Sequence, residues 1–403
     1  MPTNLLYRCG LTSMLLAAST CISAEAATFA EPADGCRMVG PSAAARSAVT
    51  SSAPVFPPPQ LQIRTPFEPT AFPSAGLNYL IYEVHLQNFS DAAMKISGIE
   101  VLAVDAPGAK PIAAFEAQQL QSLLMPFGSE AASDEGDDGV RLAGGRAAVA
   151  FFCLAFEKGS QVPHRLSHRV VLENAVLDST DVEVAHTPLR VLAPPVSGAG
   201  WIAANGPSNT SHHRLGLFTT EGAARISRRY AIDWKRLKDD ASFAGDARDV
   251  RSYHAYAQDV LAVAEGTVVS TVDGMPDNVP RTAAGFSTAV PVTMESVPGN
   301  RVVLDLGGGQ FAYYAHLQAG SIAVKKGDRV RRGQLLGRIG NSGDSREPHL
   351  HFQLANAPHI LGAEGLPHVI DRYQLRAKSG TEERTRELPI RDMRVDFKEA
   401  KTR

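Results

Sequence analysis

From residue 260 onward, the sequence is a series of short apolar runs separated by glycine-rich turns. Three of these runs are DVLAVAEGTVVS, RVVLDLGGGQFAYYAHL and PHLHFQLA. Glycine tolerates the positive φ of a tight turn because it has no Cβ, so the glycines between the runs are expected to shape turns and not to react. Short strands joined by tight turns predict an antiparallel β-sheet in this half of the chain.

The last of these runs contains an unusual pair of histidines. The stretch REPHLHFQLA, residues 346–355, places them two positions apart. Successive side chains of a strand point to opposite faces, so His349 and His351 project together while Leu350 and Phe352 point the other way. Two imidazoles on one face of an apolar strand indicate a functional site.

The N-terminal half also carries strand signals. Residues 80–87, LIYEVHLQ, alternate with the period of two that is typical of a strand. The runs ISGIEVLAV, GGRAAVAFFCLAF and HRLSHRVVLE follow between turn-rich segments. This pattern predicts a β-sandwich over residues 58–193, and so an all-β chain in which an antiparallel sheet domain follows a sandwich.

Proline and charge set the remaining boundaries. Pro194 and Pro195 cannot donate ladder hydrogen bonds, and with the following VSGAG they are expected to form a linker. The second domain is then expected over residues 197–375. Residues 376–403 are rich in charge and are expected to form a peripheral tail.

Length and charge limit the classes of protein that remain. A chain of 403 residues is too long for one ordinary core and fits two domains of medium size. A formal net charge of −2 gives no basic footprint for nucleic acid, so no nucleic-acid partner is expected. No run reaches the roughly 18 to 20 apolar residues that a transmembrane segment requires.

Residues 1–26 have the features of an export signal. Arg8 precedes a short apolar run at residues 11–18, and the small-x-small sequence AEA at residues 24–26 predicts a cleavage site. A low-complexity lead rich in Ser, Ala and Pro, residues 27–57, comes next. The mature protein is therefore expected to be exported, to the periplasm or to the extracellular space.

Cysteine usage is compatible with that compartment. Cleavage after Ala26 would leave only Cys36 and Cys153 in the mature chain. Two cysteines allow one disulfide in an oxidising compartment but do not require it.

The order of the motifs YYAHL, VKKGDRVRRGQLLGRIGNSG and PHLHF resembles the C-terminal half of the M23 metallopeptidases, of the lysostaphin and LytM type. The resemblance covers residues 197–375. The segment VKKGDRVRRGQLLG alone also resembles the hairpin of biotinyl or lipoyl carrier domains, but those domains have no HxH strand. The resemblance to M23 implies a zinc endopeptidase that cuts peptide cross-links of peptidoglycan.

The resemblance also implies roles for individual residues. In the family, zinc is held by a histidine and an aspartate of one motif and by the second histidine of HxH. Carried over by position, Asp233 in RRYAIDW and His351 are zinc ligands, while His349 and His316 of YAHL are the catalytic pair. Three ligands leave a fourth position for a water whose pKa falls to about 7. The two unligated imidazoles are then expected to move protons and stabilise the oxyanion.

The sequence departs from the family at the first ligand. Arg229 stands four residues before Asp233, where the family has a histidine, and a guanidinium has no lone pair for a metal. The upstream segment NGPSNTSHHRLGLF offers His212 and His213 instead. Similarity to M23-like sequences that pair an RYAID motif with an upstream histidine implies His213, with His212 in reserve.

Three functions follow from this reading. The first is an exported zinc metalloendopeptidase that acts on peptidoglycan cross-links. The second is a zinc-free M23-like module that binds or activates cell-wall amidases, which would make a cell-wall enzyme its partner. The third is a zinc peptidase for peptides outside the cell wall. The sequence leaves open which cross-link is cut and what the sandwich does.

Overall fold

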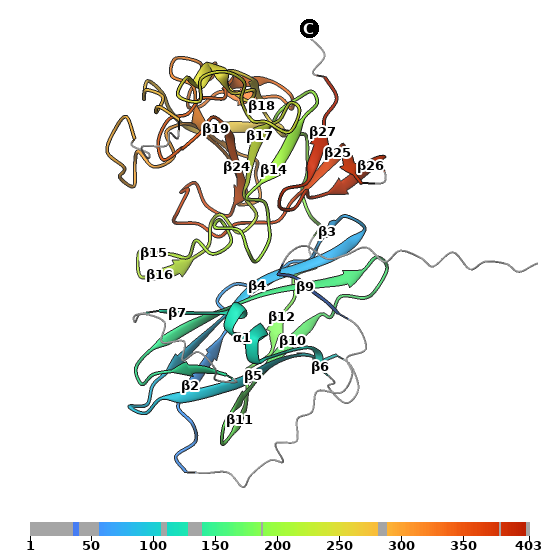
Figure 1. The fold of residues 1–403 in the computed structure, drawn as a ribbon, viewed down its shortest axis with the longest axis vertical. Helices are drawn as coiled ribbons and strands as arrows, with labels where there is room; N and C mark the ends of the chain where they lie inside the picture. Colours follow the sequence, from blue (N-terminus) through green and yellow to red (C-terminus); the bar gives the residue numbers. More distant parts are fainter. Residues whose placement is uncertain are drawn as a thin grey trace, which may run out of the picture. The chain divides into compact units, whose positions relative to one another are not determined.

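The computed structural model describes residues 35–39, 56–105, 111–127, 139–186, 188–280, 288–378 and 380–399. The predicted export signal lies outside these residues. The regular secondary structure of the described residues is almost entirely β-strand (Figure 1), as the alternating sequence runs predicted.

The first half of the described chain forms two six-stranded sheets. One sheet contains β1 (Arg37–Met38), β2 (Leu61–Arg64), β3 (Phe72–Ser74), β4 (Leu77–Asn88), β7 (Leu124–Phe127) and β9 (Ala147–Glu157). The other contains β5 (Met94–Ala103), β6 (Pro111–Glu116), β8 (Val140–Leu142), β10 (Arg165–Leu172), β11 (Val176–Asp178) and β12 (Val182–Glu183), and the short helix α1 (Ala117–Leu123) follows β6. The two sheets share one apolar core, which is the arrangement of a β-sandwich.

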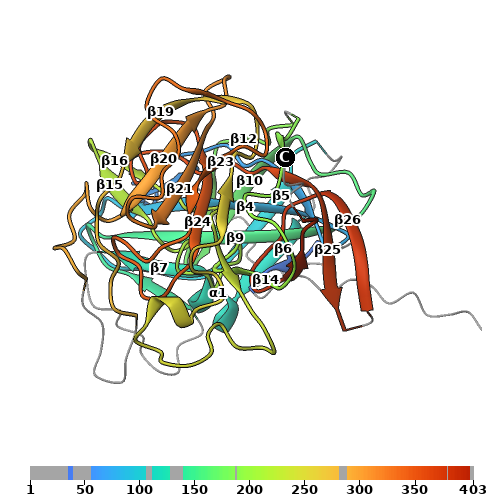
Figure 2. The same ribbon diagram turned by 90° about the horizontal axis from the view of Figure 1, so that it is seen from above.

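An eleven-stranded sheet dominates the rest of the described chain, in the order β13-β25-β27-β14-β17-β24-β21-β20-β19-β22, with β26 paired to β25. Its strands are β13 (Val191–Leu192), β14 (Trp201–Ala204), β17 (Ile232–Arg236), β19 (Gly266–Val272), β20 (Asn300–Asp305), β21 (Phe311–Leu317), β22 (Arg329–Val330), β24 (Leu350–Ala355), β25 (Val369–Ala377), β26 (Gly380–Glu387) and β27 (Arg394–Asp396). Figure 2 shows β24, β21, β20 and β19 side by side. Two two-stranded sheets, formed by β15 (Phe218–Thr220) with β16 (Ala223–Arg225) and by β18 (Asp259–Leu261) with β23 (Leu335–Arg338), complete the sheets. A 3-10 turn spans Val250–Ser252.

The charged segment 376–403 is not a peripheral tail in its described part, so that prediction was wrong. It forms β26 and β27, and β27 lies inside the large sheet between β25 and β14. Val395 on β27 is fully buried and Phe397 nearly so. High charge misled the sequence interpretation, because the exposed face of a strand tolerates charges while its other face packs.

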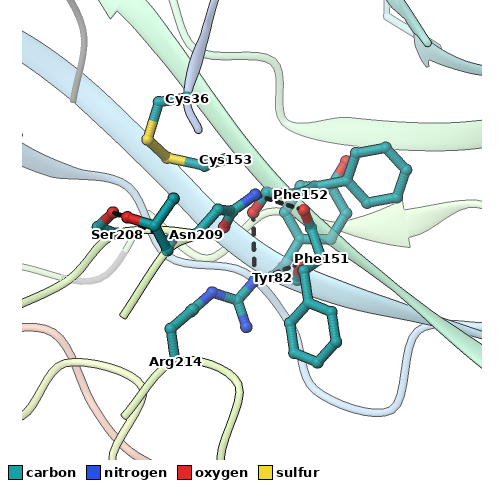
Figure 3. Close-up of a disulfide and its surroundings, with 9 residues drawn as sticks. Cys36, Tyr82, Phe151, Phe152, Cys153, Ser208, Asn209 and Arg214 are labelled. Carbon is teal, nitrogen blue, oxygen red and sulfur yellow. Dashed lines mark hydrogen bonds between the residues drawn. A yellow bond between two sulfur atoms is a disulfide. The ribbon is translucent and has the colours of Figure 1, made fainter. Parts of the chain in front are cut away.

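Part of the low-complexity lead is also structured. Arg37 and Met38 form β1, which pairs in parallel with β9. The neighbouring Cys36 makes a disulfide with Cys153 of β9 (Figure 3), so the pairing that the sequence only allowed is present.

The strand β4 is buried on both faces, and this explains its position in the molecule. Leu80 and Tyr82 point into the sandwich core, whereas Tyr79 and Ile81 join a second apolar cluster that includes residues of the large sheet. Tyr230, just before β17, belongs to this second cluster and donates a hydrogen bond to the carbonyl of Ile81. The sandwich and the large sheet therefore share a packed interface within one compact unit, residues 32–403.

Candidate metal centre

Strand register brings several predicted site residues to one place. The strands β17, β24 and β21 are neighbours in the large sheet. Asp233 on β17 is the direct antiparallel partner of His351 on β24. His351 is in turn the partner of Ala315 on β21, and His316 follows. The end of β14 pairs with Asp233 from the other side, which places Asn205 next to it.

All five predicted site residues line one cavity of about 1120 Å³. They are His213, Asp233, His316, His349 and His351, and each is less than a tenth exposed. The structure therefore brings together residues from the strands β17, β21 and β24, the residue just before β24, and a residue of a loop well upstream.

Asp233 lies at the centre of this cluster. Its Oδ1 is 2.9 Å from Nδ1 of His351 and 3.3 Å from Nε2 of His349, and its Oδ2 is 3.4 Å from Nε2 of His213. Asn205 Nδ2 donates to Oδ2 at 2.7 Å. Burial alone would raise the pKa of Asp233, but the surrounding histidines hold this pKa well below its ordinary value, so the group is a carboxylate at neutral pH.

In the imidazole rings of His213 and His351, a hydrogen bond on the side away from Asp233 determines which nitrogen can bind a cation. Nε2 of His351 lies 2.9 Å from Oε1 of Gln353, and Nδ1 of His213 lies 3.1 Å from the carbonyl oxygen of Asn205. Both partners only accept, so the hydrogen is assigned to those nitrogens, and Nδ1 of His351 and Nε2 of His213 keep lone pairs toward Asp233. Nδ1 of His351 and Oδ1 of Asp233 are then two acceptors 2.9 Å apart, and this contact is favourable only with a proton or a cation between them.

This donor set fits zinc. Two imidazole nitrogens and one carboxylate are the ligands of a catalytic site that keeps an open position. Partners that fix the ring orientation, here Asn205 and Gln353, are also typical of such sites. Burial lowers the pKa of His213 well below that of a free imidazole, so its lone pair is available at neutral pH.

His212 remains an alternative ligand. The donor atoms of His212, His213 and Asp233 all lie within 4.8 Å of one another. His212 is exposed, however, and its Nδ1 contacts Oδ1 of Asn205 at 3.1 Å. His213 is buried, and its ring centroid is 4.9 Å from that of His351. The geometry favours His213.

The predicted catalytic pair lies beside the donor set. Nδ1 of His316 is 2.8 Å from the carbonyl oxygen of Ser342, and Nδ1 of His349 is 2.8 Å from that of Glu347. These contacts assign the hydrogen to Nδ1 in both rings and leave Nε2 as the basic nitrogen. The ring centroids are 4.9 Å apart. Burial holds the pKa of His316 well below its usual value, so this ring is neutral at neutral pH.

The backbone at His316 is unusual. Its φ is 62°, in the left-handed region that a residue with a side chain seldom adopts. Such strain persists only where the surroundings hold it, and it is often found at functional sites. His316 therefore occupies a conformation that packing imposes, and its ring faces the cavity as a result.

The sequence excluded Arg229 as a ligand and missed two partners of the site. Arg229 is not among the residues that line the cavity, and its guanidinium binds Glu83 and Glu364. Gln353 lies two residues after His351 on the same strand face, so the period of two could have identified it. Asn205 belongs to another strand end, and only the pairing of β14 with β17 brings it to Asp233.

One comparison with known proteins identifies a family for the part of the chain that contains three of the five cavity residues. Residues 250–361 match the model of peptidase family M23. The C-terminal half of the chain therefore contains an M23 peptidase domain. The matched segment includes His316, His349 and His351, whereas His213 and Asp233 lie before it.

Two curated relatives come from Vibrio cholerae serotype O1. The peptidoglycan DD-endopeptidase ShyA is 39% identical over 80 residues, which cover 20% of this chain and 18% of the relative. The peptidoglycan DD-endopeptidase ShyC is 28% identical over 110 residues, 27% of this chain and 24% of the relative. The alignments thus span a quarter of each relative or less.

Solved structures give weaker likenesses. The catalytic domain of lysostaphin from Staphylococcus simulans is 21% identical, with 41% of this chain and 88% of that chain covered and a TM-score of 0.23. A zinc-containing peptidase from Vibrio cholerae is 16% identical, with 72% and 82% covered and a TM-score of 0.21. Similarity at this level carries no argument about mechanism.

Proposed function

We propose that the protein is an exported zinc metalloendopeptidase that hydrolyses peptide bonds in peptidoglycan cross-links. The observation that carries the proposal is the convergence of His213, Asp233 and His351 in one buried cavity, beside two further imidazoles. The match to peptidase family M23 and the similarity to two peptidoglycan DD-endopeptidases support the reaction and the substrate class.

The chain's own residues account for proton transfer. When bound by His213, Asp233 and His351, zinc supplies a Lewis acid that polarises a carbonyl and makes water acidic. Nε2 of His316 or of His349 accepts the proton of the attacking water and delivers it to the leaving amine. The protonated ring donates a hydrogen bond to the developing oxyanion.

Two observations support export. Residues 1–26 have the composition of a cleavable signal, and Cys36 and Cys153 form a disulfide of the kind that persists in oxidising compartments. Within the described residues no helix is long and apolar enough to cross a membrane.

The test combines metal analysis with a digest. Purified protein, dialysed against a weak chelator, is expected to retain about one zinc per chain, as a three-ligand site does. Incubation with purified sacculi should release cross-link-derived muropeptides, and a strong chelator should abolish this release. Protein that holds no zinc but stimulates a cell-wall amidase would replace the proposal with the activator function. Zinc-dependent cleavage of free peptides but not of sacculi would change the substrate.

A further inference from the structure

Two adjacent arginines in the turn before β17 have opposite environments. Arg229 is buried and bonded to Glu83 and Glu364. Arg228 lines the candidate metal cavity. Within the described residues, the side chain of Arg228 makes no hydrogen bond or ion pair, and its Nε is buried without a partner. Lys235, another cation that lines the cavity, is instead paired with Glu347.

The guanidinium of Arg228 is held close to the site. Its Nη2 packs against Gly216 so tightly that a Cβ at this glycine would lie 2.5 Å from it. Gly216 follows His212 and His213 in the same loop, and a larger residue would displace the guanidinium. The charges of Asp233 and Asp344 act on Arg228, but neither carboxylate forms an ion pair with it.

An arginine in this position lacks a protein partner for its charge. Arginine stays protonated under nearly all conditions, so it does not neutralise itself when it is buried. A buried donor without an acceptor is unfavourable, and a buried charge is more so. Arg228 is half-buried and lines the cavity that leads to the metal centre, so a peptide bound in this cavity can reach its guanidinium.

We propose that Arg228 binds a carboxylate of the peptide substrate and so determines which peptides are cleaved. The planar fork of a guanidinium matches a carboxylate through two parallel hydrogen bonds, and a neutral amide cannot provide two equivalent acceptors. The carboxylate can be the end of a peptide or a free acid on one of its side chains. The inference rests on the proposed peptidase function and adds a preference for acidic substrates at this position.

The experiment uses matched peptides that the wild-type protein cleaves. One pair differs only in a terminal carboxylate or carboxamide, and a second pair only in a side-chain carboxylate or carboxamide. The wild-type protein should prefer the acid in one of the two pairs, which identifies the source of the carboxylate. Arg228→Gln should lose this preference, with kcat/KM on the acid reduced on the order of 10- to 100-fold, mainly through KM. Arg228→Lys should retain part of it, because it keeps the charge without the fork.

Arg225→Gln is the control variant. Arg225 lies three residues away, bonds to the carbonyl of Thr220, and does not line the cavity. It should behave as the wild-type protein does. Circular dichroism and zinc content are measured for every variant, so that loss of folding or of metal is recognised.

Two outcomes would overturn the inference. In one, Arg228→Gln slows cleavage of acid and amide equally; in the other, it keeps the full preference for the acid. If the wild-type protein cleaves no peptide, the proposed function fails instead. Binding of the acid and amide peptides to the zinc-loaded protein, measured by calorimetry, then decides the role of Arg228 independently of turnover.

Discussion

At the residue scale, Asp233 organises the candidate metal centre because it contacts three histidines from two distant segments of the chain. His213 comes from an upstream loop, His349 directly precedes β24, and His351 lies on β24. One carboxylate can satisfy so many imidazoles only if their lone pairs converge on a shared cation or proton. The identity of the first ligand therefore decides whether the site holds metal at all.

The first-ligand assignment predicts a clear difference between neighbouring histidines. His213→Ala should lose zinc and peptidase activity together, because it removes one of three buried ligands. The affinity should fall by more than the roughly 10- to 100-fold that loss of an outer partner causes. His212→Ala, the matched control, should change zinc content only modestly, because its side chain is exposed. Zinc per chain after dialysis is the measurement. The opposite pattern would make His212 the ligand.

At the scale of elements, the strand β4 connects the sandwich to the loop of the metal centre. Glu83 on β4 forms ion pairs with Arg214 and Arg229, and Arg229 also binds Glu364. Arg214 directly follows His213 and donates to the carbonyls of Tyr82 and Phe152 (Figure 3). The position of His213 thus depends on strands of the sandwich, which gives that domain a structural role in the site.

Glu83→Gln tests this connection. The substitution leaves Arg214 buried without its counter-charge and leaves Arg229 paired with Glu364 alone, so the free energy of unfolding should fall by about 3–5 kcal/mol. Zinc should also be released at lower chelator concentration, because Arg214 no longer fixes the backbone beside His213. Asp178→Asn is the control: it breaks an exposed ion pair with Arg169 and should cost less than about 1 kcal/mol. Chemical denaturation and chelator titration measure both effects. Unchanged zinc retention in a folded Glu83→Gln variant would contradict the connection.

The sequence predicted elements better than it predicted this network. The alternation over residues 80–87 identified a strand, and the HxH motif identified two histidines on one face. No local pattern pairs Glu83 with Arg214, because the two residues are 131 positions apart and meet only when two domains pack. Charge alone also failed at residues 376–403, where Val395 is one of several buried apolar residues. Resemblance to a family supplied the candidate site residues, but not the interface that holds them.

At the scale of the whole molecule, the disulfide and the metal-centre loop are close neighbours on the sandwich. Cys36 is bonded to Cys153 of β9. Gly35 packs against the loop that carries the histidines, since a Cβ there would lie 2.9 Å from that of Asn209. Asn209 Nδ2 donates to the carbonyl of Phe151 at 2.5 Å (Figure 3). The loop therefore has its own bond to β9, which does not depend on the disulfide.

This arrangement predicts that the disulfide supports stability more than metal binding. It closes a loop between residues 117 positions apart and so restricts the unfolded chain. A Cys36→Ser/Cys153→Ser double variant should lose about 2–5 kcal/mol of unfolding free energy. It should nevertheless keep its zinc under native conditions, because the bond of Asn209 to β9 and the ion pairs of Glu83 remain. Denaturation curves and zinc content measured on the same samples distinguish it from Glu83→Gln.

Export with cleavage of the signal, together with the disulfide, predicts how many free thiols the mature protein has. If the segment up to Ala26 is removed, Cys36 and Cys153 are the remaining cysteines. Alkylation of the denatured, unreduced mature protein should then label no thiol, and reduction should expose two. Two free thiols before reduction would show that the pair is not oxidised in the protein as exported.

A Cys36→Ser/Cys153→Ser double variant with wild-type stability would show that the bond contributes nothing to folding. If the double variant loses zinc while its circular dichroism spectrum stays native, the disulfide is instead one of the groups that hold His213 in place.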